Sequence, residues 1–212
     1  MFDLTTIAIV LVSILLSMTL HEAMHAYVGY WLGDDTAKQE GRLTLNPFAH
    51  IDLFTTILMP LFLVMLGAPP FGAAKPVPFN PNRIKWGEYG AALVGAAGPL
   101  TNAALALLGG GVIRAFGEQL PEFWLLAVAM FTLVNLSFFI FNMIPFPPLD
   151  GSRVLYAVAP DPVRRVMEQI ESMGFAAIIF FFVLFYAVLS DPFSRLLAHL
   201  FSLLTGGGQI LL

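Results

Sequence analysis

MTLHEAMHAY, residues 18–27, interrupts an apolar run that begins near the N-terminus. His21, Glu22 and His25 fall in this run, and such side chains cost several kcal/mol in hydrocarbon unless they are paired or bound. On a helix, residues i and i+4 share one face, so His21 and His25 can hold one metal ion together. Glu22 lies beside them, where its carboxylate can take a proton from water. The stretch predicts a metal site at membrane depth; the alternatives are a chance match and a structural histidine pair.

The composition indicates a membrane protein. Of the 212 residues, 58% are hydrophobic and 11% are charged, and the mean hydropathy is +0.82. A soluble domain carries roughly twice that charged fraction. The chain has no cysteine, so any metal must be bound by His, Asp or Glu. We expect an all-α, multi-pass protein of the cell membrane, with the lipid bilayer as its surroundings and no nucleic-acid partner.

Several apolar stretches approach the ~20 residues that cross a bilayer. We expect membrane helices over 4–30, 88–114, 122–144 and 173–189, and a last apolar helix over 192–204 that spans or lies in the interface. The stretch 69–87 holds five prolines, which excludes a continuous helix and favours an extended hairpin or a loop, with alternating side chains near KPVPF, residues 75–79. We expect residues 1–212 to form one integral membrane domain, with a core over about 4–160 and C-terminal helices over about 172–205.

A catalytic zinc site has three protein ligands, so two histidines alone do not complete it. The candidates are His50, Asp52, Asp150 and the scattered loop acids. Asp150 stands out because it lies in the stretch FNMIPFPPLDG, residues 141–151, just after a helix end that prolines break. Non-helical backbone at membrane depth is tolerated where it lines a buried site. The alternative is an ordinary turn, since Pro, Asp and Gly are turn residues.

The positions of these ligands predict the membrane topology. His21 lies toward the end of the first helix and Asp150 just past the 122–144 helix, so both reach one ion only if these helices run in the same direction. An odd number of membrane crossings must then separate the two helices. Two apolar segments, 51–68 and 88–114, lie between them, so one of the two does not cross. The shorter segment, 51–68, which contains Asp52 and Pro60, is predicted to be re-entrant.

The positive-inside rule favours the same arrangement. It leaves Arg114 and Arg195 on one side of the membrane and the other eight basic residues on the opposite side: Lys38, Arg42, Lys75, Arg83, Lys85, Arg153, Arg164 and Arg165. We therefore expect the HExxH end of the first helix, and with it the active site, to lie toward the cytoplasm.

Three motifs together resemble the site-2 proteases, which are intramembrane zinc metalloproteases. The motifs are HEAMH (21–25), GAAGPLTN (95–102) and FNMIPFPPLDG (141–151). The stretches GRLTLNPFAHID and FGAAKPVPFNP also look like the compact bacterial and archaeal branch without a PDZ domain. The resemblance covers roughly residues 10–160 and implies a helical core with a re-entrant segment and a short membrane-associated hairpin.

The resemblance also implies the roles of individual residues. One zinc ion per chain would be bound by His21, His25 and Asp150, with Glu22 as the general base. Asn142 would help to hold the substrate or the oxyanion, the alternative being a hydrogen bond between helices.

Three further features are implied less directly. Asn102 matches a family position, but helix packing is the preferred interpretation. The KPVPF edge would pair with an unwound substrate strand. His50 and Asp52 would support the ligands, although capping and loop hydrogen bonds are favoured for both.

The leading hypothesis is a metalloendopeptidase that hydrolyses peptide bonds in or near transmembrane segments of protein or peptide substrates. One alternative is an intramembrane metal-binding transporter, but the motif has no second copy, and transporters often show repeats. Another is a non-catalytic helix-binding scaffold, which would not need Glu22. A third is a different membrane metalloprotease whose distal ligand is Glu88, Glu122, Glu168 or Glu171. The sequence does not indicate the substrate or the oligomeric state.

Overall fold

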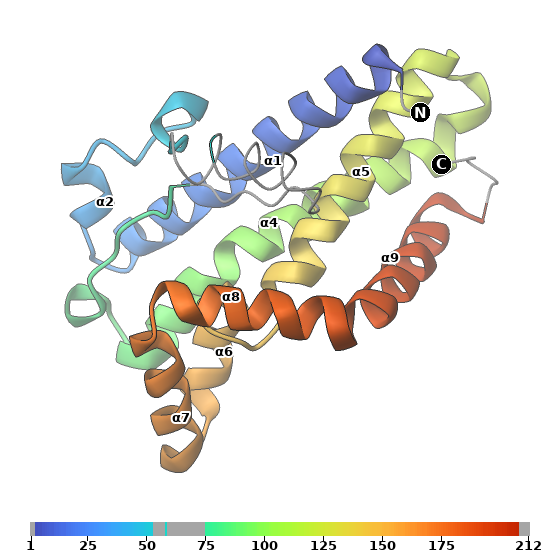
Figure 1. Cartoon of the computed structure of the whole chain (residues 1–212). Helices are drawn as coiled ribbons and strands as arrows, with labels where there is room; N and C mark the ends of the chain where they lie inside the picture. The colour runs from blue at the N-terminus through green and yellow to red at the C-terminus, as the bar shows by residue number, and fades with distance from the viewer. Residues whose placement is uncertain (1–2, 53–57, 59–74, 208–212) are drawn as a thin grey trace.

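The computed structural model describes residues 3–52, 58 and 75–207, and all regular structure within them is helical. Figure 1 shows a bundle of long helices with a two-helix arm at one end. The helices are α1 (Leu4–Trp31), α2 (Thr36–Gln39), η1 (Pro47–Ala49), η3 (Pro81–Arg83), α4 (Gly87–Phe116), η4 (Gly117–Gln119), α5 (Glu122–Asn142), α6 (Asp150–Val158), α7 (Asp161–Ser172), α8 (Phe175–Leu184), η5 (Phe185–Leu189) and α9 (Ser190–Thr205). The predicted all-α class is confirmed.

Four helical stretches of the described chain are long and apolar enough to cross a membrane. They are Leu4–Trp31, Gly87–Gln119, Glu122–Asn142 and Phe175–Thr205. The first begins at Asp3, whose carboxylate caps the helix by accepting a hydrogen bond from the Thr6 N–H at 2.7 Å. These helices show a membrane protein, as the composition predicts.

Helix α4 lies at the centre of the bundle and packs against α1, α5, α6 and α9. Much of its buried face consists of glycine and alanine, including Ala91, Gly95, Gly98 and Ala106. Small residues let helices approach closely in lipid, where association depends on packing. Helices α1 and α5 run in the same direction and α4 runs in the opposite one (Figure 1). The C-terminal ends of α1 and α5 therefore lie at the same end of the bundle, as the ligand positions require.

The C-terminal region differs from the prediction. Separate helices over 173–189 and 192–204 were expected, but Phe175–Thr205 is one helical run, joined by the π-helical turn η5. Pro192 lies within this run, shortly after η5, and a local π-helical turn is one way in which a membrane helix accommodates a proline. Phe181 and Phe185 pack edge-on against Phe141 of α5, with ring centroids 5.6 and 5.4 Å apart, and hold the run against the bundle.

The predicted re-entrant segment 51–68 lies outside the described residues except for 51, 52 and 58. The first part of the expected hairpin, 69–74, also lies outside them. The second part, 75–80, is described and is neither helix nor strand. The Lys75 N–H donates to the His50 carbonyl at 3.0 Å, and the Asn80 N–H donates to Asp34 Oδ2 at 2.6 Å. We call residues 75–80 the overlying segment.

A buried arginine ties the overlying segment to the loop that follows α2. Arg42 is 4% exposed, and its guanidinium donates hydrogen bonds to the carbonyls of Ala49, Lys75 and Pro76. The segment is thus held to the end of the bundle where α1 terminates.

Candidate active site

His21, His25 and Asp150 come together although 129 residues separate the first from the last. The Nε2 atoms of His21 and His25 are 3.0 Å apart, and Asp150 Oδ2 lies 3.1 Å from the first and 3.4 Å from the second. Both histidines are buried and Asp150 is partly buried. Ligand atoms around a tetrahedral zinc ion lie ~3.3 Å apart at Zn–N and Zn–O lengths of about 2.0–2.1 Å. The spacing of the three atoms therefore fits a zinc ion.

The other nitrogen of each imidazole is already hydrogen-bonded. His25 Nδ1 lies 2.6 Å from the Val94 carbonyl oxygen, and His21 Nδ1 lies 2.6 Å from Asn102 Oδ1. Because a carbonyl oxygen only accepts, each Nδ1 carries the proton and each Nε2 presents a lone pair. Two lone pairs and a carboxylate oxygen thus converge on one point, an arrangement that a cation stabilises.

Gly98 provides the space beside this cluster. A Cβ atom at residue 98 would lie 2.4 Å from His25 Nε2 and 2.6 Å from His21 Nε2. Any side chain there would clash with the Nε2 atoms of both histidines. α4 can therefore pass directly against the two histidines of α1 only with glycine at this position.

Asp150 lies at the first position of α6, not in a loop. Gly151 is helical as well. Its lack of a side chain serves packing, because a Cβ there would lie 2.4 Å from the Met143 carbonyl oxygen. Gly151 lets α6 start against the end of α5, which brings Asp150 to the histidines.

Glu22 is half-buried, and its Oε2 accepts a hydrogen bond from the Val77 N–H at 3.1 Å. The overlying segment therefore passes next to the predicted base. Pro76 and Pro78 have no N–H, and the N–H groups of Lys75 and Val77 are already bonded to His50 and Glu22. Within residues 75–79 only Phe79 keeps an N–H to offer an added strand, which limits the predicted pairing with a substrate strand.

Two predicted residues do not join the cluster through any contact of the described chain. Asn142 Nδ2 donates to the Phe138 carbonyl at 2.9 Å, within its own helix, so its proposed oxyanion role stays a prediction. His50 is fully buried, and its Nε2 lies 2.9 Å from the Thr44 carbonyl oxygen. This is the loop hydrogen bond that the sequence favoured.

The alternative glutamate ligands are engaged or placed elsewhere. Glu171 pairs with Arg153 at 2.6 Å, and Glu168 accepts from the Tyr156 hydroxyl at 2.6 Å, which raises the pKa of that tyrosine. Glu122 begins α5, at the end of the helix opposite to Asn142. Glu88 lies in the first turn of α4. Among the described residues only His21, His25 and Asp150 form a group that could hold a metal ion.

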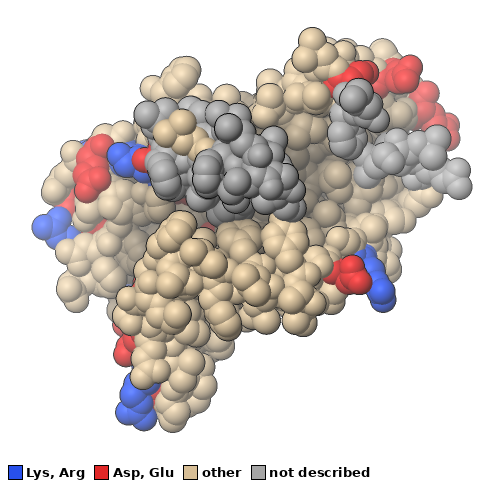
Figure 2. All heavy atoms as spheres, in the orientation of Figure 1, with Lys and Arg blue, Asp and Glu red and all other residues tan. Residues whose placement is uncertain are grey.

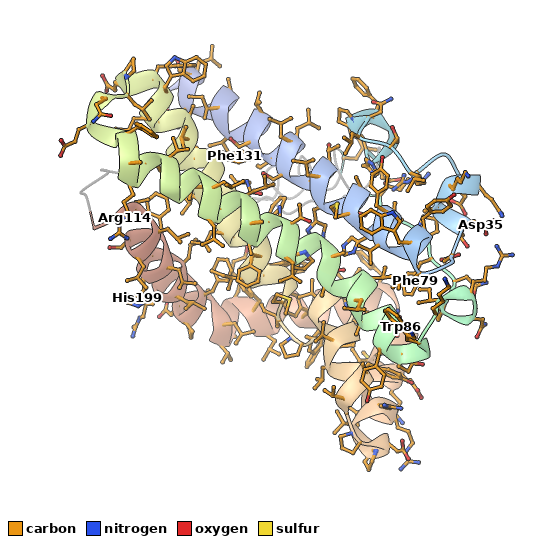
Figure 3. All side chains as sticks on the ribbon, turned by 180° about the vertical axis from the view of Figure 1, so that it is seen from behind. Asp35, Phe79, Trp86, Arg114, Phe131 and His199 are labelled. Atoms are coloured by element: carbon orange, nitrogen blue, oxygen red, sulfur yellow. The ribbon has the colours of Figure 1, made fainter. Side chains whose placement is uncertain are left out.

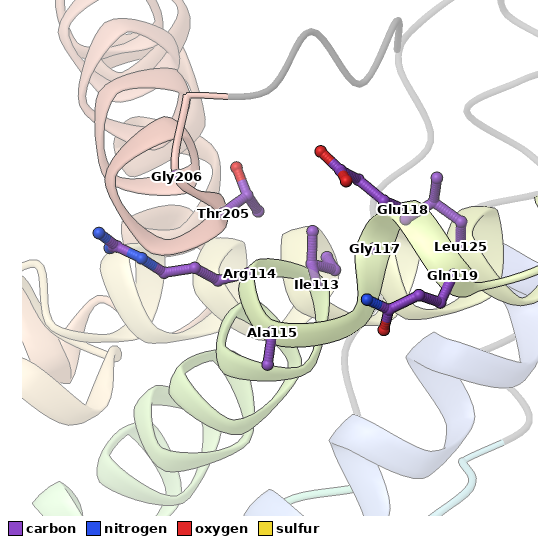
Figure 4. A pocket seen from close by; sticks show the side chains of 9 residues that line it. All are labelled: Ile113, Arg114, Ala115, Gly117, Glu118, Gln119, Leu125, Thr205 and Gly206. Atoms are coloured by element: carbon purple, nitrogen blue, oxygen red, sulfur yellow. The ribbon is translucent and has the colours of Figure 1, made fainter.

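A pocket of about 600 Å³ lies at the far end of α4, where Arg114, Glu118 and Thr205 line it (Figure 4). It contains none of the cluster residues. Of the two remaining histidines, His199 is exposed on α9 (Figure 3) and His50 is held in its loop.

Two contributors to this site were not predicted as such. Asn102, noted as a family position but assigned to helix packing, bonds His21 in addition to Ser17 of α1 and Asn135 of α5; its position four residues after Gly98, on the same face of α4, was the available signal. Val77 carried no signal, because its contribution is a backbone N–H.

The comparisons with known proteins point to zinc metalloproteases. Residues 109–186 match the model of peptidase family M50. The chain is 38% identical over 193 residues to "Putative zinc metalloprotease YwhC" of Bacillus subtilis, covering 86% of this chain and 83% of that protein. No solved structure matches.

More distant relatives carry a similar name. "Putative zinc metalloprotease Rip2" of Mycolicibacterium smegmatis is 27% identical over 167 residues, 78% of this chain and 62% of that protein. The protein of the same name from Mycobacterium tuberculosis is 29% identical over 176 residues, 82% of this chain and 64% of that protein. The chain thus spans less than two thirds of the Rip2 proteins but most of YwhC. With an all-helical membrane fold and a His, His, Asp cluster built on HEAMH, the chain belongs to peptidase family M50, the site-2 proteases.

Proposed function

We propose that this protein hydrolyses peptide bonds in or near transmembrane segments of membrane-protein substrates, with zinc held by His21, His25 and Asp150. The observation that carries the proposal is the convergence of His21 Nε2, His25 Nε2 and Asp150 Oδ2, 3.0–3.4 Å apart, beside Glu22. When bound, zinc supplies Lewis-acid chemistry, polarising a carbonyl and making water acidic enough to lose a proton near neutral pH. The donor set of two imidazoles and one carboxylate leaves a fourth position open, as in catalytic zinc sites.

Glu22 is the proposed general acid and base. Its carboxylate takes a proton from the attacking water and returns it to the amide nitrogen of the leaving strand. The Val77 N–H, 3.1 Å from Oε2, holds the carboxylate in one orientation. A scaffold or a transporter has no comparable use for a carboxylate restrained in this way.

The substrate class follows from the surroundings of the site. His21 and His25 lie on α1, which is long and apolar enough to cross a membrane, and they pack against α4, which is so as well. A substrate segment that reaches them would therefore come through lipid. A helical segment must unwind locally before cleavage, because its carbonyls are shielded by intrahelical hydrogen bonds.

We also propose a multi-pass arrangement with the active site toward the cytoplasm, and a single domain over residues 1–212 with its core at about 4–160. Eight of the 10 Lys and Arg residues support this orientation through the positive-inside rule. On the face seen in Figure 2, blue side chains gather near α2 and α7, the end of the bundle where α1 terminates, and also occur beside α9.

The orientation can be tested by cysteine labelling, because the chain has no cysteine of its own. An impermeant maleimide applied to intact cells should label Glu118→Cys, in η4, and should label Ser172→Cys, at the end of α7, only after permeabilisation. The reverse pattern would contradict the proposed orientation.

The activity is tested by measuring zinc content and cleavage of a transmembrane substrate in detergent. Wild type should carry about one zinc per chain, Glu22→Gln should keep zinc and lose activity at least about 100-fold, and Asp150→Ala should lose both. Asp35→Asn changes an exposed carboxylate in an ion pair with Arg83 and serves as the control. Full zinc and activity in Asp150→Ala would eliminate the third ligand.

A further inference from the structure

We propose that Asn135 of α5 is a positioning residue that sets the protonation form of His21 through Asn102. The inference rests on the proposed role of His21 as a zinc ligand. It concerns a chain of hydrogen bonds that crosses three helices, from the Phe131 carbonyl on α5 (Figure 3) through Asn135 and Asn102 to α1.

The first step is the contact between His21 and Asn102. A carboxamide presents an acceptor oxygen on one side and a donor NH₂ on the other. With Oδ1 toward His21 Nδ1, 2.6 Å away, the imidazole proton lies on Nδ1 and Nε2 is free for a metal. With the NH₂ there, the proton would move to Nε2 and point at Asp150 and His25, and no lone pair would be left for the metal.

The second step decides which way the Asn102 amide faces. Its nitrogen Nδ2 lies 2.9 Å from Asn135 Oδ1 and 3.3 Å from the Ser17 carbonyl oxygen. Both partners are acceptors, so only the NH₂ satisfies them. The opposite orientation would set Asn102 Oδ1 against two oxygens, and Asn102 is fully buried, where water does not relieve the mismatch.

The third step anchors the direction of the chain. Asn135 Nδ2 donates to the Phe131 carbonyl at 2.9 Å, one turn back on α5. A main-chain carbonyl accepts and cannot donate, so Asn135 must turn its Oδ1 toward Asn102. Asn135 is fully buried as well. The Phe131 carbonyl therefore decides which way both amides face, and so decides that His21 Nε2 keeps its lone pair. This carbonyl belongs to α5, which carries none of the proposed ligands.

A purely structural role predicts something different. Two buried asparagines that only join α4 to α5 would contribute to stability, and their loss would leave zinc affinity unchanged once the protein is folded. A positioning role predicts weaker zinc binding, since removing the partner that orients a ligand typically costs 10–100-fold in metal affinity.

The test measures zinc affinity by competition with a chelator of known affinity, on purified protein whose helical content and elution match wild type. Asn135→Leu should bind zinc about 10-fold or more weakly. Asn135→Asp should stay within about three-fold of wild type, because a buried carboxyl is neutral and can donate to the Phe131 carbonyl while accepting from Asn102. Asn135→Ala replaces the leucine variant if that one does not fold. Thr132→Val is the matched control, because Thr132 is also fully buried on α5 but bonds only the Val128 carbonyl of its own helix.

A double-mutant comparison tests whether Asn135 affects zinc binding through Asn102. If Asn135 acts through Asn102, then Asn135→Leu added to Asn102→Leu should weaken zinc binding no further. Wild-type affinity in folded Asn135→Leu, or additive losses in the double variant, would overturn the inference while leaving the proposed function intact. A wild-type protein that binds no zinc would overturn both, and one that binds zinc without cleaving substrate would overturn the proposed function alone.

Discussion

The backbone N–H of Val77 donates a hydrogen bond to Oε2 of Glu22 at 3.1 Å, joining residues that are 55 positions apart. One partner is the carboxylate of the HEAMH motif and the other belongs to a proline-flanked segment without regular structure. The orientation of the Glu22 carboxylate thus depends on the main chain of Val77 and not on the valine side chain.

Removing that N–H should impair catalysis without affecting the metal. Val77→Pro deletes the donor, and loss of a hydrogen bond to a charged group costs ~1.5–3 kcal/mol, so kcat/KM should fall by about 10-fold or more at unchanged zinc content. Val77→Ala keeps the N–H and should retain most activity. Equal activities of the two variants would mean that Glu22 does not depend on this contact.

The space at Gly98 should be essential for metal binding. In Gly98→Ala the new Cβ would lie 2.4 Å from His25 Nε2, so zinc content should fall to near zero and activity with it. Gly111→Ala is the matched control on the same helix, because no atom lies within 4 Å of its added Cβ and alanine is favoured over glycine in helices by about 1 kcal/mol. Zinc measured by elemental analysis distinguishes the two, and a Gly98→Ala protein that keeps its zinc would refute this packing argument.

Replacing Arg42 should destabilise the protein more than replacing Arg83. Arg42→Met removes a buried guanidinium and leaves the carbonyls of Ala49 and Lys75 without their donor in a partly buried place, which costs ~1–3 kcal/mol and should lower thermal stability and activity together. Arg83→Met breaks an exposed ion pair with Asp35, worth ~0–1 kcal/mol. Thermal unfolding followed by circular dichroism provides the comparison; similar losses in both variants would show that Arg42 does not hold the overlying segment.

Removing the metal should abolish activity while leaving the bundle folded. Packing among α1, α4 and α5 involves faces along the lengths of these helices, so a chelator should eliminate cleavage while the far-ultraviolet circular dichroism stays unchanged. Adding zinc should restore cleavage in wild type, and should restore zinc content without cleavage in Glu22→Gln. Unfolding on chelation would instead show that the site holds the helices together, as in small zinc domains.

The helix pattern and the shared face of His21 and His25 were predictable because both depend on local periodicity. The apolar run around residues 4–30 and the four-residue spacing of His21 and His25 each specify a helix and a face without any long-range information. Asp150 was singled out by its place after a proline-broken helix end, and the parallel direction of α1 and α5 that its approach to His21 requires is found in the structure. The prediction of separate C-terminal helices was wrong because the π-helical turn η5 joins the two stretches into one helical run.

By itself, the sequence determined a membrane protein made of helices, with two histidines and a glutamate in one turn and an aspartate after a proline-broken helix end. Only the tertiary structure decided which groups complete the site: the Asn102 amide, the Val94 carbonyl, the Val77 N–H and the space left by Gly98. Local spacing fixes which residues share a helix face within about one turn. The rotation and depth at which α4 and the overlying segment pack against α1 depend on contacts between residues tens of positions apart, and those contacts exist only in the folded chain.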